Sequence, residues 1–181
     1  SWIKDSISDQ EAKAILNINS LAHRDLSLAR NVGALPWVID DITETEWSPL
    51  GSLSNLKASG NLPPDEPVGF RWVVDDMTDP ERWALYYLNK LSEKDSTLGK
   101  YVIRLPWVVD DITSDEKWAL RNLSGLLDGD SPLAKKVVDM PWVVDDITSD
   151  ERWALRNLRD LLDGDSPLAK KVVDMPWVVD D

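Results

Sequence analysis

A six-residue stretch, Pro-Trp-Val-Val-Asp-Asp, recurs along the chain and sets its period. It occupies 106–111, 141–146 and 176–181, and it recurs at 36–41 with Ile in place of the second Val. Its tryptophans are 35 residues apart or a multiple of that, and Trp2 and Trp72 fall on the same grid. Such a period is typical of arrays that stack copies of one supersecondary unit. The chain, residues 1–181, is therefore expected to be a single repeat array of five units, 2–36, 37–71, 72–106, 107–141 and 142–176, with 177–181 beginning a further unit.

Each unit is predicted to contain two helices. In 142–176, Thr148 and Glu151 have the spacing of a capping box, which opens a helix. Apolar residues then recur with helical spacing for about four turns, and Gly164 is expected to end the helix in the left-handed conformation. Ser166, which precedes a proline, is expected to cap a second, shorter helix. The predicted fold is all-α, a right-handed α-solenoid of five helix-pair repeats of about 35 residues.

Nearly all of the ten tryptophans fall at two phases of the repeat, which favours a packing role over exposed ligand platforms. A single unit cannot bury its apolar face alone, so large rings are expected to fill the joints between stacked units. The residues assigned to these joints are Trp2, Trp37, Trp72, Trp83, Trp107, Trp118, Trp142, Trp153 and Trp177.

The second unit, 37–71, departs from the pattern. Pro49 lies where a helix interior is expected, so Ser48 is predicted to cap a shortened helix over 50–58. The segment 61–71 has three prolines and is predicted to be an extended surface loop. Loops on a rigid scaffold often carry function, although a degenerate unit is the alternative. The candidate binding residues in this loop are Pro63, Pro64 and Phe70.

Composition limits the partners. The formal net charge of −13 argues against nucleic-acid phosphates and anionic membranes, and it favours solubility and cationic partners. No apolar run approaches the roughly 18 residues of a membrane span, so membrane insertion is not expected. The sequence has no cysteine, which excludes disulfides and thiolate chemistry without identifying a compartment.

The sequence contains no recognisable catalytic constellation. His23 is the only histidine, and the chain has no phosphate-cradling glycine loop and no metal-ligand spacing. The acidic stretch 145–151 lacks the central glycine of a calcium loop, and capping already accounts for two of its oxygen-bearing side chains. We therefore expect no enzyme activity, no cofactor and no metal site, with a calcium-binding module as a weak alternative.

The exposed side of the first helix in units three to five is predicted to carry cations. In the fifth unit Arg152, Arg156 and Arg159 stand at i, i+4 and i+7. Stacked copies would form a band that suits an acidic peptide or a glycan. In the alternative, each cation makes an ordinary surface pair with a nearby carboxylate such as Asp145 or Asp160. The other members of this predicted surface are Arg82, Tyr86, Lys117 and Arg121.

The motif Leu-Pro-Trp-Val-x-Asp, followed by Ile-Thr-x-x-Glu, stands at 35–46 and 105–116, and at 140–151 with Met for Leu. It resembles bacterial tandem α-helical repeats that read P-W-V-x-D-G-I-T-x-x-E. In length and logic the helix pair also resembles tetratricopeptide α-solenoids, without their W-x2-L-G-x2-Y signature. The resemblance implies an all-α repeat array, a bacterial surface or secreted protein, and no assigned activity. In place of the glycine of the bacterial motif, this chain has Asp41, Asp111 and Asp146.

The leading functional hypothesis is a non-catalytic scaffold for protein–protein interaction, and the alternative is a structural spacer or stalk. The diverged second unit favours a scaffold, whereas the near-identity of units four and five favours a spacer. End-to-end self-association is also expected at high concentration. Units four and five differ only at the pairs Lys117/Arg152, Ser124/Arg159 and Gly125/Asp160.

Overall fold

The computed structural model describes residues 7–39, 42, 46–63, 68–74, 77–164 and 166–179, and within these ranges the chain is all-helical, without a β-strand. The longer helices are α1 (Asp9–Arg24), α4 (Trp47–Ala58), α5 (Asp79–Lys94), α8 (Ser114–Gly129) and α11 (Ser149–Gly164). Shorter helices are α2 (Leu26–Val32), α6 (Ser96–Val102), α9 (Ser131–Val138) and α12 (Ser166–Val173). The shortest are α3 (Pro36–Ile39), the 3-10 helix η2 (Arg71–Val73), α7 (Pro106–Asp110), α10 (Pro141–Val144) and α13 (Pro176–Val179).

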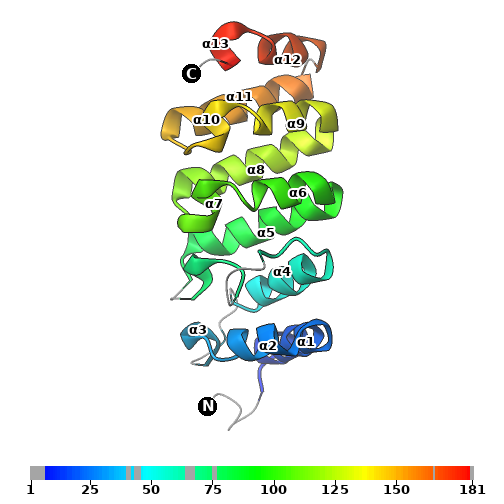
Figure 1. The fold of residues 1–181 in the computed structure, drawn as a ribbon, viewed down its shortest axis with the longest axis vertical. Coiled ribbons are helices and arrows are strands. Elements are labelled where there is room, and N and C mark those ends of the chain that lie inside the picture. Colours follow the sequence, from blue (N-terminus) through cyan, green and yellow to red (C-terminus); the bar gives the residue numbers. More distant parts are fainter. Residues whose placement is uncertain are drawn as a thin grey trace.

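The longer helices contact one another in chain order: α1 with α4, α4 with α5, α5 with α8, and α8 with α11. Each shorter helix packs on the longer helix that precedes it, as α6 does on α5 and α9 on α8. In Figure 1 these pairs follow one another along the long axis, and α3, α7, α10 and α13 lie along one edge. One continuous apolar core extends from Ala14 to Val178, so every pair buries its apolar face against its neighbours.

Capping boxes open most of the longer helices. The Thr113 hydroxyl accepts a hydrogen bond from the Glu116 N–H at 3.3 Å, and the Glu116 carboxylate accepts one from the Thr113 N–H at 2.5 Å. At the start of α5, the Thr78 N–H donates to Glu81. Thr43, which holds the equivalent position in the second unit, lies outside the described residues. The same reciprocal bonds join Ser8 to Glu11 and Thr148 to Glu151.

In units one, three and four the link between the paired helices is a single extended aspartate, not the predicted glycine turn. The Asp130 N–H donates to the Leu126 carbonyl at 2.9 Å, and its carboxylate accepts from the Leu133 N–H at 3.0 Å. One residue therefore satisfies the end of α8 and the start of α9 together. Gly164 belongs to α11 and has no positive φ, and Ser166 already lies inside α12, so both predicted roles are wrong.

The helix of the second unit begins earlier than predicted. It starts at Trp47 with Glu46 as its N-cap, so Ser48 is a helical residue and not a cap. Pro49 lies in the first turn, where backbone N–H groups have no intrahelical acceptor. The missing N–H of a proline therefore costs nothing at this position.

The segment after α4 is not the exposed loop that its prolines suggest, at least from residue 68 onward. Phe70 is fully buried and stacks on Trp72, with ring centroids 4.8 Å apart. Val68 is also buried, and Phe70 stands at the repeat position of Leu35, Leu105 and Met140, which are buried as well. Phe70 is therefore wrongly assigned as an exposed binding residue. Pro63 is half-buried, and Pro64 lies outside the described residues.

Candidate binding groove

The tryptophans of the first phase, which fall on the grid of the Pro-Trp motif, join each unit to the next. Trp72 and Trp107 are buried, and the Trp107 indole N–H donates to the Val143 carbonyl at 2.8 Å. A buried indole N–H needs an acceptor, and a very short helix leaves its own carbonyls unpaired. The other bonds of this ladder are Trp37 to Val73, Trp72 to Val108 and Trp142 to Val178, at 2.7 to 2.8 Å.

The tryptophans of the second phase do not fill joints, contrary to the prediction. Trp83, Trp118 and Trp153 are 47%, 37% and 45% exposed. The joint is filled instead by the next two residues of each helix, such as Ala119 and Leu120, which are fully buried. Successive helical residues are about 100° apart around the axis, so a tryptophan one position earlier projects toward the surface. Trp2 and the Trp177 side chain lie outside the described residues.

Cations cover the exposed indole rings of α8 and α11. The Arg121 guanidinium lies 4.8 Å from the Trp118 ring centroid, and the Lys117 ammonium lies 5.2 Å from it. Arg152 and Arg156 each lie 4.9 Å from the Trp153 ring centroid. Contacts of this kind contribute roughly 0.5–1 kcal/mol at exposed sites. They hold cationic side chains above each ring in the same arrangement on neighbouring helices.

Helix α5 presents aromatic rings at the corresponding place. Trp83 packs edge-on against Tyr86 at 5.7 Å between centroids and stacks on Tyr87 at 6.0 Å. Lys90 lies 5.7 Å from the Tyr86 ring centroid. Burial raises the pKa of the Tyr87 hydroxyl, which therefore remains neutral. This end of the surface therefore presents a cluster of aromatic rings where α8 and α11 present single indoles beneath cations.

Two adjoining hollows connect these side chains into one surface, which we call the Trp–Arg groove. The first lies between α8 and α11, with a volume of about 410 Å³, and is lined by Trp118, Arg121, Asn122, Arg152, Trp153, Arg156 and Arg159. The second lies over α5 and α8, with a volume of about 450 Å³, and is lined by Tyr86, Tyr87, Lys90, Lys94, Arg121, Ser124, Gly125, Asp128 and Arg159. Because Arg121 and Arg159 line both hollows, the groove crosses all three helices.

Several of the cations pair with carboxylates at the rim. Arg152 pairs with Asp115 of the preceding unit at 2.9 Å, rather than with the predicted Asp145. Arg159 pairs with Asp160 at 2.6 Å and holds the pKa of that carboxyl below its usual range. The guanidinium of Arg159 also donates to the Asn122 amide oxygen at 2.7 Å. These contacts fix the arginines in place across the boundary between units.

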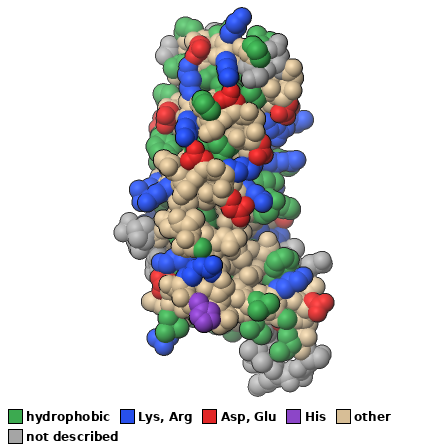
Figure 2. Space-filling view, turned by 90° about the vertical axis from the view of Figure 1, so that its right-hand side faces the viewer, with side chains coloured by type: hydrophobic (Ala, Val, Ile, Leu, Met, Phe, Trp, Pro, Cys, Tyr) green, Lys and Arg blue, Asp and Glu red, His purple; other side chains and the backbone are tan. Residues whose placement is uncertain are grey.

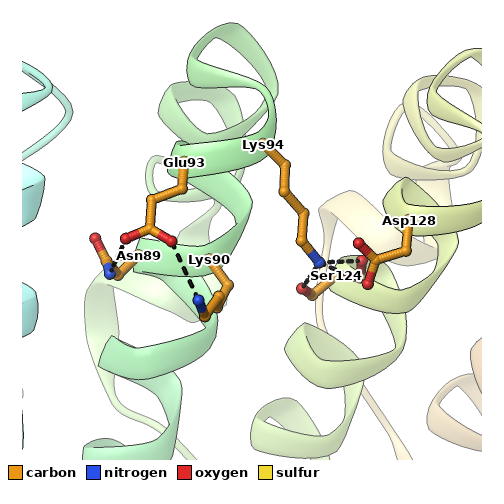
Figure 3. Close-up of polar contacts among 6 residues, drawn as sticks. All are labelled: Asn89, Lys90, Glu93, Lys94, Ser124 and Asp128. Atoms are coloured by element: carbon orange, nitrogen blue, oxygen red, sulfur yellow. Dashed lines mark hydrogen bonds and ion pairs between the residues drawn. The ribbon is translucent and has the colours of Figure 1, made fainter.

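Lys94 anchors the α5 edge of the groove to α8. Its ammonium donates to the Ser124 carbonyl at 3.2 Å and to the Ser124 hydroxyl at 3.1 Å, and it pairs with Asp128 at 2.7 Å. Figure 3 shows Lys94 reaching across, while the neighbouring Lys90 stays on its own helix with Glu93. The two helices that form this part of the groove are therefore tied by polar contacts as well as by their core.

Of the predicted binding residues, Tyr86, Arg121, Arg152, Arg156 and Arg159 line the groove together. Lys117 lies beside it, above Trp118 and 3.6 Å from Asp79, and Arg82 pairs with the same aspartate at 3.1 Å. Sequence reasoning missed the tryptophans as groove residues. One sequence pattern could have indicated their position beneath cations: in units four and five, a cation stands directly before the tryptophan and another stands three residues after it. Missed groove residues are Tyr87, Lys90, Lys94, Trp118, Asn122, Ser124, Gly125, Asp128 and Trp153.

Outside the groove, charge is mixed. On the face drawn in Figure 2, basic and acidic side chains are interspersed along the long axis, with apolar side chains between them. In the described ranges, three or more His, Asp or Glu side chains nowhere come together as a metal site would need. None of the described helices is long and apolar enough to cross a bilayer.

Neither a protein-family model, nor a curated protein, nor a solved structure matches this chain.

Proposed function

We propose that the chain is a right-handed α-solenoid of five repeats, four of them helix pairs and the second with α4 alone of such a pair among its described residues, and that it acts as a non-catalytic scaffold that binds a partner protein through the Trp–Arg groove. The chain-order contacts of the longer helices and the indole ladder between units support the solenoid. The stacked helices hold recurring tryptophan–cation clusters side by side. A rigid surface of this kind suits recognition.

One observation carries the proposal: the differences between units four and five gather at the groove. Arg152 and Arg159 line it in unit five, and Ser124 and Gly125 line it in unit four. The remaining members of these pairs, Lys117 and Asp160, flank it, since Lys117 lies above Trp118 and Asp160 pairs with Arg159. Everything that only stacks the units is identical between them.

A structural spacer is the second candidate. The same near-identity favours it, because a spacer needs only repeated stacking contacts. A spacer, however, has no need for cations held over exposed rings on three successive helices. The two functions differ in whether the groove binds a ligand.

Selection from a phage-displayed library of random peptides tests the scaffold function. We expect enrichment of peptides that bind the wild-type chain with micromolar dissociation constants, in the range usual for small linear motifs. The double variant Arg121→Ser/Arg156→Ser should lose this binding at least about tenfold, because both side chains are exposed groove residues.

The matched control is Lys100→Ser/Lys171→Ser, which removes the same charge from exposed positions on α6 and α12 outside the groove. It should bind the selected peptides as the wild type does. A selection that yields no peptide sensitive to Arg121 and Arg156 would contradict the scaffold function and leave the spacer.

A further inference from the structure

We infer that the ligand of the Trp–Arg groove is an extended acidic peptide lying across the helices, with carboxylates about three residues apart and an aromatic residue at the α5 end. This inference rests on the proposed scaffold function. It adds the chemistry, conformation and spacing of the ligand.

The charge of the groove selects an anion. Among the described residues, the lining of the hollow between α8 and α11 includes four arginines and no carboxylate, although the whole chain has a net charge of −13. At its rim Asp115 pairs with Arg152, and Asp160 pairs with both Arg156 and Arg159, so the arginines outnumber the carboxylates that meet them. Arginine presents a planar fork of donors that matches a carboxylate in a bidentate fashion. Arg121 and Arg156 are exposed and lie over tryptophan rings, so their side chains are held at the groove before a ligand arrives.

The spacing follows from the stacking of helices. Arg121 and Arg156 occupy equivalent positions on α8 and α11, and these two helices pack directly against each other. Packed helices lie about 8–10 Å apart. A peptide in the extended polyproline II conformation advances about 3.1 Å per residue and completes a turn every three residues, so side chains three residues apart face the same surface. About three residues of peptide therefore separate one arginine from the next.

At the α5 end of the groove, the peptide is expected to place an aromatic side chain instead of a carboxylate. Tyr86 occupies there the position that Arg121 and Arg156 hold on the next two helices, and it packs with Trp83. An aromatic residue placed three positions from the nearest acidic residue would reach these rings. Aromatic pairs prefer the edge-on and offset-stacked geometries that this cluster already contains.

A peptide fits better than a nucleic acid. Single-stranded nucleic acids bind by stacking bases on exposed aromatic faces, but Arg121 and Arg156 lie over the rings of Trp118 and Trp153. Carboxylates at the rim, such as Asp128, would also repel a continuous polyanion. A peptide with discrete carboxylates can meet the arginines and avoid these groups.

Fluorescence anisotropy with synthetic peptides tests the inference. The probe is a fluorescein-labelled peptide, Tyr-Ser-Ser-Glu-Ser-Ser-Glu-Ser, compared with the same residues ordered so that the two glutamates are adjacent. We expect the spaced peptide to bind at least about tenfold more tightly than the rearranged one, since only one glutamate of the latter reaches an arginine. Arg121→Glu/Arg156→Glu should abolish the preference, and Lys100→Ser/Lys171→Ser should retain it.

Circular dichroism of each variant shows that the fold is kept, which is expected because all four positions are exposed. Equal binding of the two peptides, or no binding of either while library-selected peptides still require Arg121 and Arg156, would overturn the inferred ligand and leave the scaffold function intact. Tighter binding of a ten-residue oligothymidylate than of the spaced peptide would overturn it in favour of nucleic acid.

Discussion

Trp107 and Trp118 belong to the same unit, and their positions around the fold give them opposite roles. Trp107 is 4% exposed and bonds to the next unit through Val143. Trp118 is 37% exposed and lies beneath Lys117 and Arg121. The same type of side chain therefore stabilises the packing of units at one position and lines the groove at the other.

Trp107→Ala should lower the free energy of unfolding by about 3–5 kcal/mol, because it leaves a cavity and an unpaired Val143 carbonyl. Trp118→Ala in the same unit should cost under about 1 kcal/mol, since it removes mainly surface contacts. Urea titrations followed by circular dichroism measure both. Similar losses for the two variants would contradict the assigned roles.

The aspartates that link paired helices make stability depend on pH. Lys135 and Lys170, each from the following unit, hold the pKa values of Asp95 and Asp130 below their usual range, together with the N–H bonds that these carboxylates accept as caps. The folded pKa of each lies below the unfolded one, so the unfolded chain takes up protons first as the pH falls. Their contribution is complete above the unfolded pKa of about 4 and is lost as the pH falls through the folded pKa.

Asp95→Asn/Asp130→Asn keeps a capping oxygen at both sites but removes the charge. We expect this variant to melt at a lower temperature than the wild type at pH 7, and the difference to shrink below pH 4. Thermal melts between pH 7 and pH 2 measure this dependence. A melting difference that stays constant over this range would show that the charges do not contribute.

At the scale of elements, two glycines permit close approaches of different kinds. A Cβ at Gly99 of α6 would lie 2.6 Å from the Ser92 Cα and 2.8 Å from its backbone nitrogen in α5. A Cβ at Gly125 of α8 would meet the Arg159 Cδ at 2.5 Å. Backbone cannot yield without moving a helix, whereas the Arg159 side chain can change rotamer at the cost of its surface contacts with Asn122 and Asp160.

Gly99→Ala should therefore destabilise the protein by about 1–3 kcal/mol through overpacking, despite the better helix propensity of alanine. Gly125→Ala should be neutral or stabilising by up to about 1 kcal/mol. Denaturant titration of the two variants provides the measurement. A stable Gly99→Ala variant would mean that α6 and α5 can separate without loss.

At the scale of the whole molecule, contacts between neighbouring units repeat with the period of the sequence. Each indole of the ladder bonds to a carbonyl 36 residues ahead. Ion pairs such as Lys117 with Asp79 and Arg152 with Asp115 join equivalent places in successive units. Stability in such an array is approximately a sum of unit and nearest-neighbour terms.

Deleting 107–141, one complete period, should leave a folded protein, because Trp72 would then meet the Val143 carbonyl in place of Val108. Its melting temperature should be lower, because the array loses one unit and its contacts with a neighbour. Deleting 107–124, about half a period, removes α7 and most of α8 and breaks the phase, so this variant should lose cooperative melting. Circular dichroism melts compare the two. Equal cooperativity in both deletions would contradict stacking by period.

The sequence alone determined the helical class, the capping boxes and the cations that recur on the first helix of units three to five. These depend on local spacing: T-x-x-E sets a helix start, and positions four residues apart share a helix face. The sequence also indicated Arg121 and Arg156 as members of one exposed cationic surface, because equivalent positions in equal units must lie side by side if the units stack.

Tertiary structure alone decided which aromatic residues are buried. Trp107 and Trp118 are the same residue type in the same unit, yet Trp107 is buried and Trp118 reaches the surface. Whether an aromatic side chain is buried depends on how closely neighbouring helices approach. Ala119 and Leu120 already occupy the joint between α8 and its neighbours, so Trp118 is left at the surface. The aspartate link is local, because Asp is a favoured N-cap for any helix, and the sequence could have indicated it. The indole ladder could not be predicted in this way, since each indole meets its carbonyl only when two units stack.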